Sequence, residues 1–436
     1  MTRLKLAARE TFRSLHTPNF RLFFVGQIIS HTGTWMEMIA VIWLVLQLTD
    51  SGVALGLVTA AQFGPLLLLG AWTGLLADRA DRHHLMLTTQ VLFALSAALL
   101  AVLVVTDHIT VTLLYVFAAS FGVITAIDNP TRRALVNDLV ASQDVPNAVG
   151  LNSAIMTGAR VAGPTIAGLL IAGPGVEWCF VVNALSYLAV IWALTRMNRE
   201  TMRRSPRVAR AKGQLREGFA YVRRTPELLL PLVLVAVAGT LAMNYPITLP
   251  LLAERSLGGD VTTFTMLYAT MSAGSVMGAL QVARRRDVAI GVLVRAGMGL
   301  AVSILALAMA PATPLATAAA LAVGFHMVFL VSGSNTVVQL RADPLMRGRV
   351  LALFSMVFLG SKPIGGPLVG WVSEAVGPRV GVAVGGLGMA LGTAWVLHRV
   401  RHHEPAEPSA SLRWTPALAT GPEDPAHEVG RAHARR

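Results

Sequence analysis

The chain has 436 residues, of which 54% are hydrophobic and 14% are charged, and its mean hydropathy is +0.61. This composition is too apolar for a soluble globular protein and leaves room for about a dozen membrane-spanning helices of roughly 20 residues each. The formal net charge of +13 does not indicate a nucleic-acid-binding protein, because the basic residues lie in loops between apolar runs. The single cysteine, Cys179, excludes an internal disulfide and a multi-cysteine metal cluster.

Long apolar runs predict an all-α integral membrane protein with twelve transmembrane helices. The first run is too long for the core of a signal peptide, so we expect a retained span. The predicted helices cover residues 20–48, 53–76, 85–106, 111–129, 146–172, 177–196, 228–252, 262–283, 288–310, 315–339, 350–374 and 378–399. An even number of spans places both termini on the same side of the membrane.

Lysine and arginine residues occur mainly in every second loop, and this asymmetry predicts the orientation. The segment 196–224 holds ten of them, whereas the short loops on the opposite side offer only Arg255 and Arg379. By the positive-inside rule, both termini and this long segment are cytoplasmic, and the protein is a multi-pass component of the inner membrane.

The long basic segment divides the chain into two six-helix halves. The predicted organisation is a cytoplasmic N-terminal segment (1–19), an N-terminal half (20–196), a cytoplasmic linker (197–227), a C-terminal half (228–399) and a cytoplasmic tail (400–436). The tail is rich in Pro, Ala, Glu, His and Arg and lacks apolar periodicity, so we expect it to be disordered.

The two halves contain an internal repeat. Residues 158–168 align without gaps on residues 360–370, and the cation Arg160 falls on Lys362. Three glycines recur at the same offset, pairing Gly158, Gly163 and Gly168 with Gly360, Gly365 and Gly370. Together with nearby prolines, these glycines allow close helix packing and local kinking, which suits rocking between two halves. Parallel six-helix repeats are an architecture of secondary transporters.

Several motifs resemble those of the major facilitator superfamily, over residues 15 to about 400. The stretch from Gly74 to His84 resembles the superfamily's cytoplasmic loop between helices 2 and 3, in which a glycine precedes an Asp-Arg pair. The segment 18–46 is similar to the enterobactin-exporter-like group of drug and siderophore exporters, and Gly163-Pro164 with Gly168 resembles the helix-5 motif of antiporters. Drug antiporters often carry an arginine inside helix 4, whereas we expect Arg132 and Arg133 at the cytoplasmic end of that helix.

This resemblance implies a cytoplasmic gate. Its candidate residues are Gly74, Asp78, Arg79, Arg82, Arg132 and Arg133. We expect Asp78 near the N-terminus of helix 11, where the helix dipole favours an acid, and near Arg132 or Arg133. The matching loop of the second half has Val282 in place of the acid, so only the first half carries this latch. The alternative is that Arg79 and Arg82 serve only as topological anchors.

The resemblance also implies that helices 1, 4, 7 and 10 line a central cavity, and polar residues recur at helical spacing on these helices. The candidate cavity residues are Gln27, Ser30, Thr34, Glu37, Thr240, Asn244, Ser332, Asn335 and Gln339, together with Arg160 and Lys362 from helices 5 and 11. The alternative for the neutral residues is hydrogen bonding between packed helices. Arg160 and Lys362 either pair across helices or attract an anionic substrate; the alternative is snorkelling to the interface.

Two acids are candidates for proton coupling. Glu37 lies near the middle of its predicted span and has no cation at helical spacing. A carboxyl group in a low-dielectric environment favours its neutral form, so it can exchange protons or bind a cationic group. Asp128 has Arg132 four residues later, and an ion pair there favours a structural role. The alternative for Glu37 is a neutral, hydrogen-bonded packing role.

The sequence contains no catalytic constellation, no cofactor motif, no metal-ligand spacing and no phosphate-binding loop ending in Gly-Lys-Ser/Thr. We therefore predict a protein that is not an enzyme: a monomeric secondary transporter that works by alternating access and exports small amphipathic compounds of drug or siderophore type, driven by protons. Two alternatives stay open, namely an importer on the same fold and a non-transporting membrane sensor.

Overall fold

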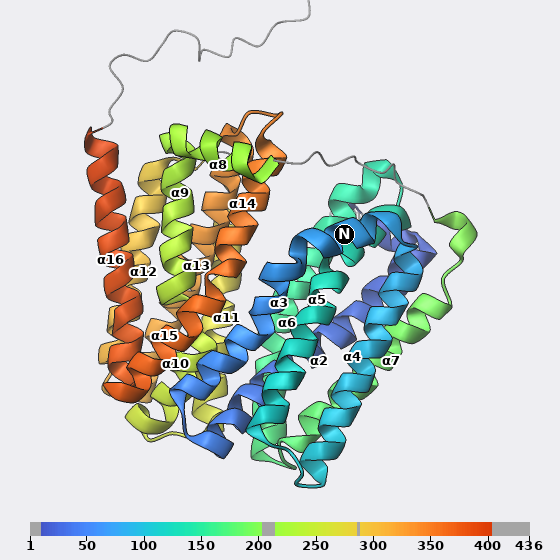
Figure 1. Cartoon of the computed structure of the whole chain (residues 1–436), viewed down its shortest axis with the longest axis horizontal. Helices are drawn as coiled ribbons and strands as arrows, with labels where there is room; N and C mark the ends of the chain where they lie inside the picture. Colours follow the sequence, from blue (N-terminus) through green and yellow to red (C-terminus); the bar gives the residue numbers. More distant parts are fainter. Residues whose placement is uncertain (1–9, 203–213, 286–287, 403–436) are drawn as a thin grey trace, which may run out of the picture. The chain divides into compact units, whose positions relative to one another are not determined.

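The computed structural model describes residues 10–202, 214–285 and 288–402, and every regular element in these ranges is helical (Figure 1). The first nine residues, the basic stretch 203–213 of the predicted linker, Arg286 and the tail from residue 403 lie outside the description. The same holds for five side chains, those of Ala71, Leu75, Asp78, Gln214 and Leu215. Residues up to Leu397 form one compact unit, and all contacts described below lie within it.

The first predicted half forms six long helices after a short turn, η1 (Arg13–His16). They are α2 (Pro18–Thr49), α3 (Gly52–Arg79), α4 (Arg82–Val105), α5 (Val111–Leu139), α6 (Val145–Ala172) and α7 (Glu177–Thr195), with the turns η2 (Ser142–Asp144) and η3 (Arg199–Thr201). Polar residues cap the helix starts: Ser51 accepts the backbone N–H of Ala54 at 3.2 Å, and Asp81 accepts those of His83 and His84 at 3.0 Å.

The second half is more interrupted. It begins with the surface helix α8 (Gln214–Arg224) and continues through α9 (Pro226–Val237), η4 (Ala238–Ala242), α10 (Tyr245–Leu251) and η5 (Leu252–Ser256). The remaining helices are α11 (Val261–Ala283), α12 (Ile290–Met309), α13 (Thr313–Arg341), α14 (Arg347–Gly360), α15 (Lys362–Ala375) and α16 (Pro378–His402). Helices α2 to α7 gather in one group and α9 to α16 in a second, as Figure 1 shows by their colours.

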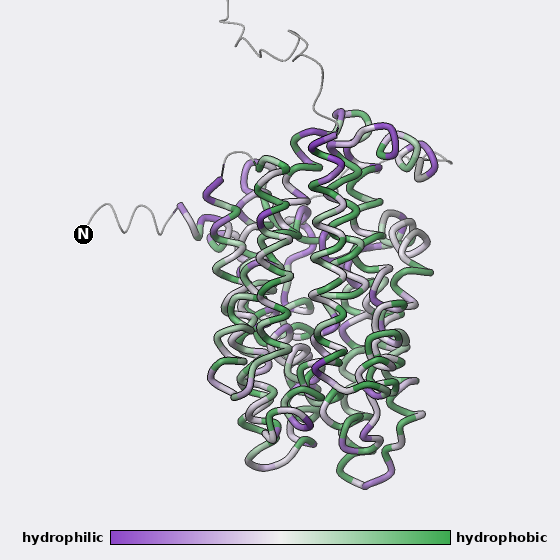
Figure 2. The backbone as a smooth tube through the Cα atoms, turned by 90° about the vertical axis from the view of Figure 1, so that its left-hand side faces the viewer, coloured by the Kyte–Doolittle hydropathy of each residue, from purple (hydrophilic) through white to green (hydrophobic). Residues whose placement is uncertain are grey.

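Eleven helical stretches in the described ranges are long and apolar enough to cross a membrane. The predicted span that is not among them is α11, whose 23 uncharged residues at about 1.5 Å each are still long enough to cross a hydrocarbon core. In Figure 2, hydrophobic residues dominate the middle of the helices, and hydrophilic residues gather toward the upper end. This distribution is that of a multi-pass helical membrane protein.

The predicted end of the fourth span at residue 129 is wrong. Helix α5 continues to Leu139, with Pro130 inside it, so Arg132 lies within a helix and not at its end. A proline removes one backbone donor and usually marks a helix boundary, but membrane helices tolerate it where neighbours compensate. Here α2, α4 and α7 pack around this part of α5 and hold it helical.

The seventh and eleventh spans, predicted as continuous helices, are broken. The seventh passes through two π-helical segments, η4 and η5, and is interrupted at Met243–Asn244 before Pro246. The eleventh changes direction at Ser361, which separates α14 from α15 just before Pro363. Prolines and glycines in both spans weaken the helical hydrogen-bond ladder, so these are places where membrane helices bend.

The two groups of helices touch where α3 packs on α15 and α6 packs on α11. Glycines permit this approach: a Cβ atom on Gly56 would lie 2.7 Å from the carbonyl oxygen of Gly366. The neighbouring turn adds polar contacts, since Ser51 Oγ donates to Glu374 Oε2 at 2.6 Å and Arg255 pairs with Asp50 at 2.7 Å. We call this side of the molecule, where residues 49–53, 252–256 and 370–376 meet, the Asp50 end.

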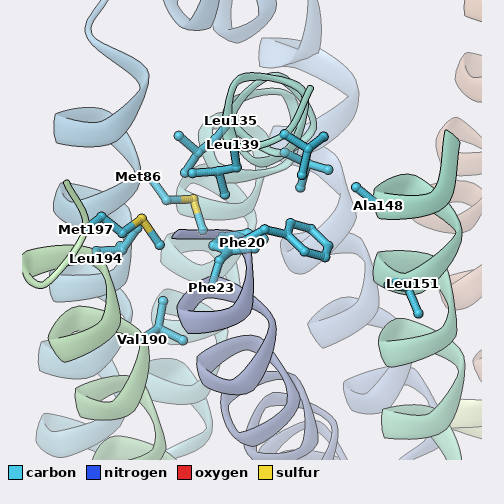
Figure 3. Close-up of a cluster of buried hydrophobic side chains, with 12 residues drawn as sticks. Phe20, Phe23, Met86, Leu135, Leu139, Ala148, Leu151, Val190, Leu194 and Met197 are labelled. Carbon is cyan, nitrogen blue, oxygen red and sulfur yellow. The ribbon is translucent and has the colours of Figure 1, made fainter. Parts of the chain in front are cut away.

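A cluster of buried apolar side chains lies within the first group of helices, at the end opposite the Asp50 end. Phe20 and Phe23 of α2 are fully buried, and Figure 3 shows them between side chains of α4, α5, α6 and α7. The other labelled members are Met86, Leu135, Leu139, Ala148, Leu151, Val190, Leu194 and Met197. This cluster ties the ends of five helices into one body.

Candidate functional site

A cavity with about 950 Å³ of empty space, part of it open to solvent, lies between the two groups of helices. Its walls come from α2, α3, α4 and α5 on one side and from the break at Met243–Asn244, α10, α11 and α15 on the other. The lining residues are mainly apolar and aromatic, with Trp35, Phe63, Phe117, Phe121 and Tyr268 as the aromatic members. Among the described lining residues only Glu37 and Lys362 are charged. This composition suits an organic molecule with an apolar body.

Glu37 sits in the cavity wall on α2 and is half-buried. Its carboxylate accepts a hydrogen bond of 2.5 Å from Asn183 Nδ2 of α7. One turn earlier on the same helix face, Thr34 hydrogen-bonds the hydroxyl of Tyr187 at 3.0 Å. No ion pair involves Glu37 within the described part of the chain, so a neutral partner alone fixes its position.

A second polar cluster lies away from the cavity, between α2, α4 and α5. Asp128 is 1% exposed and pairs with Arg132, one helical turn later. Its carboxylate also accepts Thr89 Oγ1 at 3.0 Å and Gln90 Nε2 at 2.8 Å. The guanidinium of Arg132 in turn donates to Gln27 Oε1 at 2.9 Å and to the ring of His31. Gln27 was predicted to line the cavity. In the structure it is not a lining residue and instead binds Arg132 in this network.

The two cations that the repeat aligns both rest on aromatic rings. Lys362 lines the cavity at the start of α15, and its Nζ lies 4.2 Å from the ring centroid of Phe63. Arg160 of α6 places its guanidinium carbon 5.2 Å from the ring centroid of Trp35, which is itself a lining residue. Contacts of this kind stabilise a cation by about 0.5–2 kcal/mol without neutralising its charge.

The other predicted cavity residues divide into two sets. Thr34 and Asn244 line the cavity along with Glu37 and Lys362. Ser30, Arg160, Thr240, Ser332, Asn335 and Gln339 are not among its lining residues. Helix α13 contributes no lining residue to this cavity among those described, so a contribution of helix 10 stays a prediction. Helices α3, α4, α11 and α15 contribute lining residues as well.

The glycines of the repeat mediate close packing. Gly163 lies against the backbone of α2 beside Trp35, and Gly168 lies against Thr265 of α11. In the second half, Gly365 lies against Thr240, and Gly370 lies against Gly52. Of the remaining motif residues, Gly360 faces Leu67, Pro164 is buried, and no atom lies within 4 Å of a Cβ built on Gly158. Three of these contacts, at Gly168, Gly360 and Gly370, join one group of helices to the other.

The predicted gate loop is compact. Arg82 pairs with Asp138 at the end of α5 at 2.7 Å, while Arg79 and Arg133 are exposed. Gly74 is buried, and Asp81 caps the start of α4. The pKa of the Asp81 carboxylate is lowered, chiefly because it accepts the backbone N–H of His84. The side chain of Asp78 lies outside the described residues, and Arg132, its predicted partner, is engaged by Asp128.

The aromatic walls of the cavity, above all Phe63, Phe121 and Tyr268, were not predicted from the sequence. Aromatic side chains on a membrane helix look alike in the sequence whether they face lipid, another helix or a cavity. A usable signal lay in the polar residues Gln62 and Ser96, which also line the cavity and lie in spans two and three. Asn183 was likewise missed, because its partner Glu37 is 146 residues away.

Known proteins resemble this chain in sequence. A family model described as transmembrane secretion effector matches residues 9–424. The staphyloferrin A transporter of Staphylococcus aureus (strain NCTC 8325 / PS 47) is 26% identical over 265 residues, which are 60% of this chain and 66% of that protein, just under two thirds of its length. The multidrug efflux pump Tap of Mycolicibacterium fortuitum is 25% identical over 368 residues, or 82% of this chain and 89% of that protein.

Solved structures share the fold. A bacterial homologue of the human lysosomal transporter Spinster, in an inward-facing conformation, superimposes with a TM-score of 0.69 at 15% sequence identity. The likeness covers 88% of this chain and 97% of that one. At this level of identity the similarity establishes the arrangement of helices and nothing about the transported molecule.

Proposed function

Because the chain belongs to the transmembrane secretion effector family of the major facilitator superfamily, and is thus a membrane transporter and not an enzyme, we propose that it exports small amphipathic compounds. The proposal places it in the inner membrane with both termini in the cytoplasm, and it couples export to proton entry by alternating access. Single-chain function, as a monomer, belongs to the same proposal.

The observation that carries this proposal is the cavity shared by both groups of helices. Its aromatic and apolar walls bind hydrophobic bodies of many shapes, and a single acid and a single base among its described lining residues supply orientation. A site at the boundary of two repeats is where alternating access requires the substrate to bind. Relatives named as a multidrug efflux pump and as a macrolide efflux protein support outward transport of such molecules.

Contacts at the Asp50 end support a cycle between two states. Ser51–Glu374 and Asp50–Arg255 join the two groups of helices there, whereas the ion pairs described at the opposite end, such as Arg82–Asp138 and Arg349–Glu217, each stay within one group. The Asp50–Arg255 pair is largely exposed, with Asp50 74% accessible. Exposed pairs stabilise by only about 0–1 kcal/mol, so the closure can reverse at low cost.

The proposed orientation makes the Asp50 end the external one, so the described state loads substrate from the cytoplasm. Proton coupling is assigned to Glu37, which faces the cavity and is held by the neutral Asn183. A proton bound there when the cavity opens outward, and released inward, would drive the cycle. The Asp78 latch stays a proposal for the state closed to the cytoplasm, in which Arg132 would first have to exchange partners.

Transport into everted membrane vesicles tests the proposal. Cells that express the chain yield vesicles whose lumen corresponds to the cell exterior, so export appears as accumulation inside. With an imposed proton gradient, acid inside, we expect accumulation of an uncharged amphipathic dye such as Nile red, and we expect Glu37→Gln to remove its dependence on the gradient.

Glu254→Gln is the matched control, because Glu254 is an exposed acid whose side chain makes no ion pair or hydrogen bond within the described part of the chain. It should accumulate dye like the unmodified protein. Uptake by right-side-out vesicles and none by everted ones would assign import instead. Gradient-driven accumulation unchanged by Glu37→Gln would remove Glu37 from the coupling while leaving export in place.

A further inference from the structure

Arg160 and Lys362 place two positive charges at the wall of the cavity, one from each half. Arg160 is on α6, which packs on α11, and Lys362 opens α15, which packs on α3. Lys362 lines the cavity and rests on the ring of Phe63, whereas Arg160 is not itself a lining residue but rests on the ring of Trp35, and both rings line the cavity. Both halves therefore supply positive charge to this wall.

Neither cation has an acidic partner within the described ranges of the chain. The seven ion pairs found there involve other residues, and the contacts of Arg160 and Lys362 are with the rings of Trp35 and Phe63. A ring face holds a cation in place but leaves its charge in full. Two like charges in a low-dielectric cavity repel each other, which is a cost that a bound anion would remove.

Glu37 does not serve as that anion. Its carboxylate accepts a hydrogen bond from Asn183 of α7, and one turn earlier Thr34 bonds Tyr187 of the same helix. The acid is thus held by α7, whereas the two cations are held by the rings of Trp35 and Phe63.

From these contacts we propose that the cavity selects amphipathic organic anions, with a carboxylate of the substrate held between Arg160 and Lys362 and its apolar body against the aromatic walls. This rests on the proposed export function and specifies its substrate class. A guanidinium and an ammonium both bind carboxylates through charge-assisted hydrogen bonds, and the Tyr268 hydroxyl adds a donor. Phe63 and Trp35 pre-position the two cations, so little side-chain entropy is lost on binding.

The placement of one cation in each half gives the anion a second role. A carboxylate that contacts both cations cancels their repulsion and links α6 to α15, so it favours states in which the two halves approach each other around the substrate. A ligand shifts a conformational equilibrium only through such a difference in affinity between states. An uncharged molecule of the same shape would bind the walls without this effect.

The test uses three probes with one aromatic body and different head groups: 1-pyrenebutyrate, 1-pyrenebutanol and a pyrenebutyl-trimethylammonium salt. Affinity is measured on the full-length protein in lipid nanodiscs by energy transfer from tryptophan to pyrene. We expect the unmodified protein to bind the carboxylate at least tenfold more tightly than the alcohol. Arg160→Gln and Lys362→Gln should each reduce this ratio severalfold, and the double variant should bring it close to one.

Binding of pyrenebutanol reports whether each variant is folded and should stay unchanged. Lys362→Arg should keep the preference, and Arg295→Gln, which changes an exposed cation on α12 outside the cavity, should keep it too. Equal affinity for alcohol and carboxylate, a preference for the ammonium probe, or a preference that survives the double variant would overturn the proposal. Dye export in everted vesicles is independent of this result, so failure of the anion site and failure of export are told apart.

Discussion

Replacing Asp128 by alanine should cost the protein much of its stability, because it leaves a buried arginine unpaired. The carboxylate has three donors, namely Arg132, Thr89 at 3.0 Å and Gln90 at 2.8 Å, and Arg132 is only 8% exposed. After the substitution, Arg132 keeps Gln27 and His31, which are neutral hydrogen-bond partners and do not cancel its charge. Breaking a buried pair by removing one partner costs about 3–5 kcal/mol, and we expect a loss in that range.

The double variant Asp128→Asn/Arg132→Gln separates charge from hydrogen bonding. Both of its residues are neutral and can still bond each other and their neighbours, so it should lose clearly less than Asp128→Ala alone. Unfolding by sodium dodecyl sulfate in bicelles, followed by tryptophan fluorescence, gives the free energies. Glu254→Ala is the control for an exposed acid and should lie within about 0.5 kcal/mol of the unmodified protein. A cost below about 1 kcal/mol for Asp128→Ala, or a double variant less stable than it, would refute the reasoning.

Three further predictions concern the contacts between helices. Gly56→Val should separate α3 from α15, because the valine side chain would meet the backbone of Gly366. Spin-label distances across the Asp50 end should then lengthen, and unchanged distances would contradict the packing of these two helices. Glu374→Gln should weaken the bond from Ser51 and increase the population open at that end in the same measurement. Asp81→Ala should lose an N-cap worth about 1 kcal/mol. Folding lowers the pKa of Asp81, so its carboxylate stabilises the protein above the unfolded pKa of about 3.9 and loses this effect as the pH falls below it. The difference in free energy of unfolding between Asp81→Ala and the unmodified protein should therefore shrink toward pH 3.

Much of the fold could be predicted because apolar length is a local property. Each of the twelve predicted spans is found as a helix or a broken helix, since a backbone in lipid must satisfy its own hydrogen bonds within the segment. The errors occur at prolines and glycines. Helix α5 continues through Pro130, whereas the seventh span is broken at Asn244 and the eleventh at Ser361. Prolines and glycines are thus compatible with both a continuous and a broken helix.

The candidate site was likewise predictable from the sequence only in part. Glu37 stands out in the sequence because an acid in an apolar run is rare, and the spacing of Asp128 and Arg132 predicts that they meet on one helix face. The partners that define their environments are remote in the sequence: Asn183 for Glu37, and His31 for Arg132. Sequence spacing contains no information on such contacts.

The sequence by itself determined that this is a twelve-span protein built from two related halves, because hydropathy and a repeated glycine pattern are written along the chain. Only the tertiary structure decided which helix faces enclose the cavity and that Arg160 and Lys362 rest on Trp35 and Phe63, two rings of its wall. The physical reason is that lipid, helix and cavity all accept the same apolar and aromatic side chains. The direction in which Phe63 or Tyr268 points is therefore set by how the helices pack, and not by the residue type.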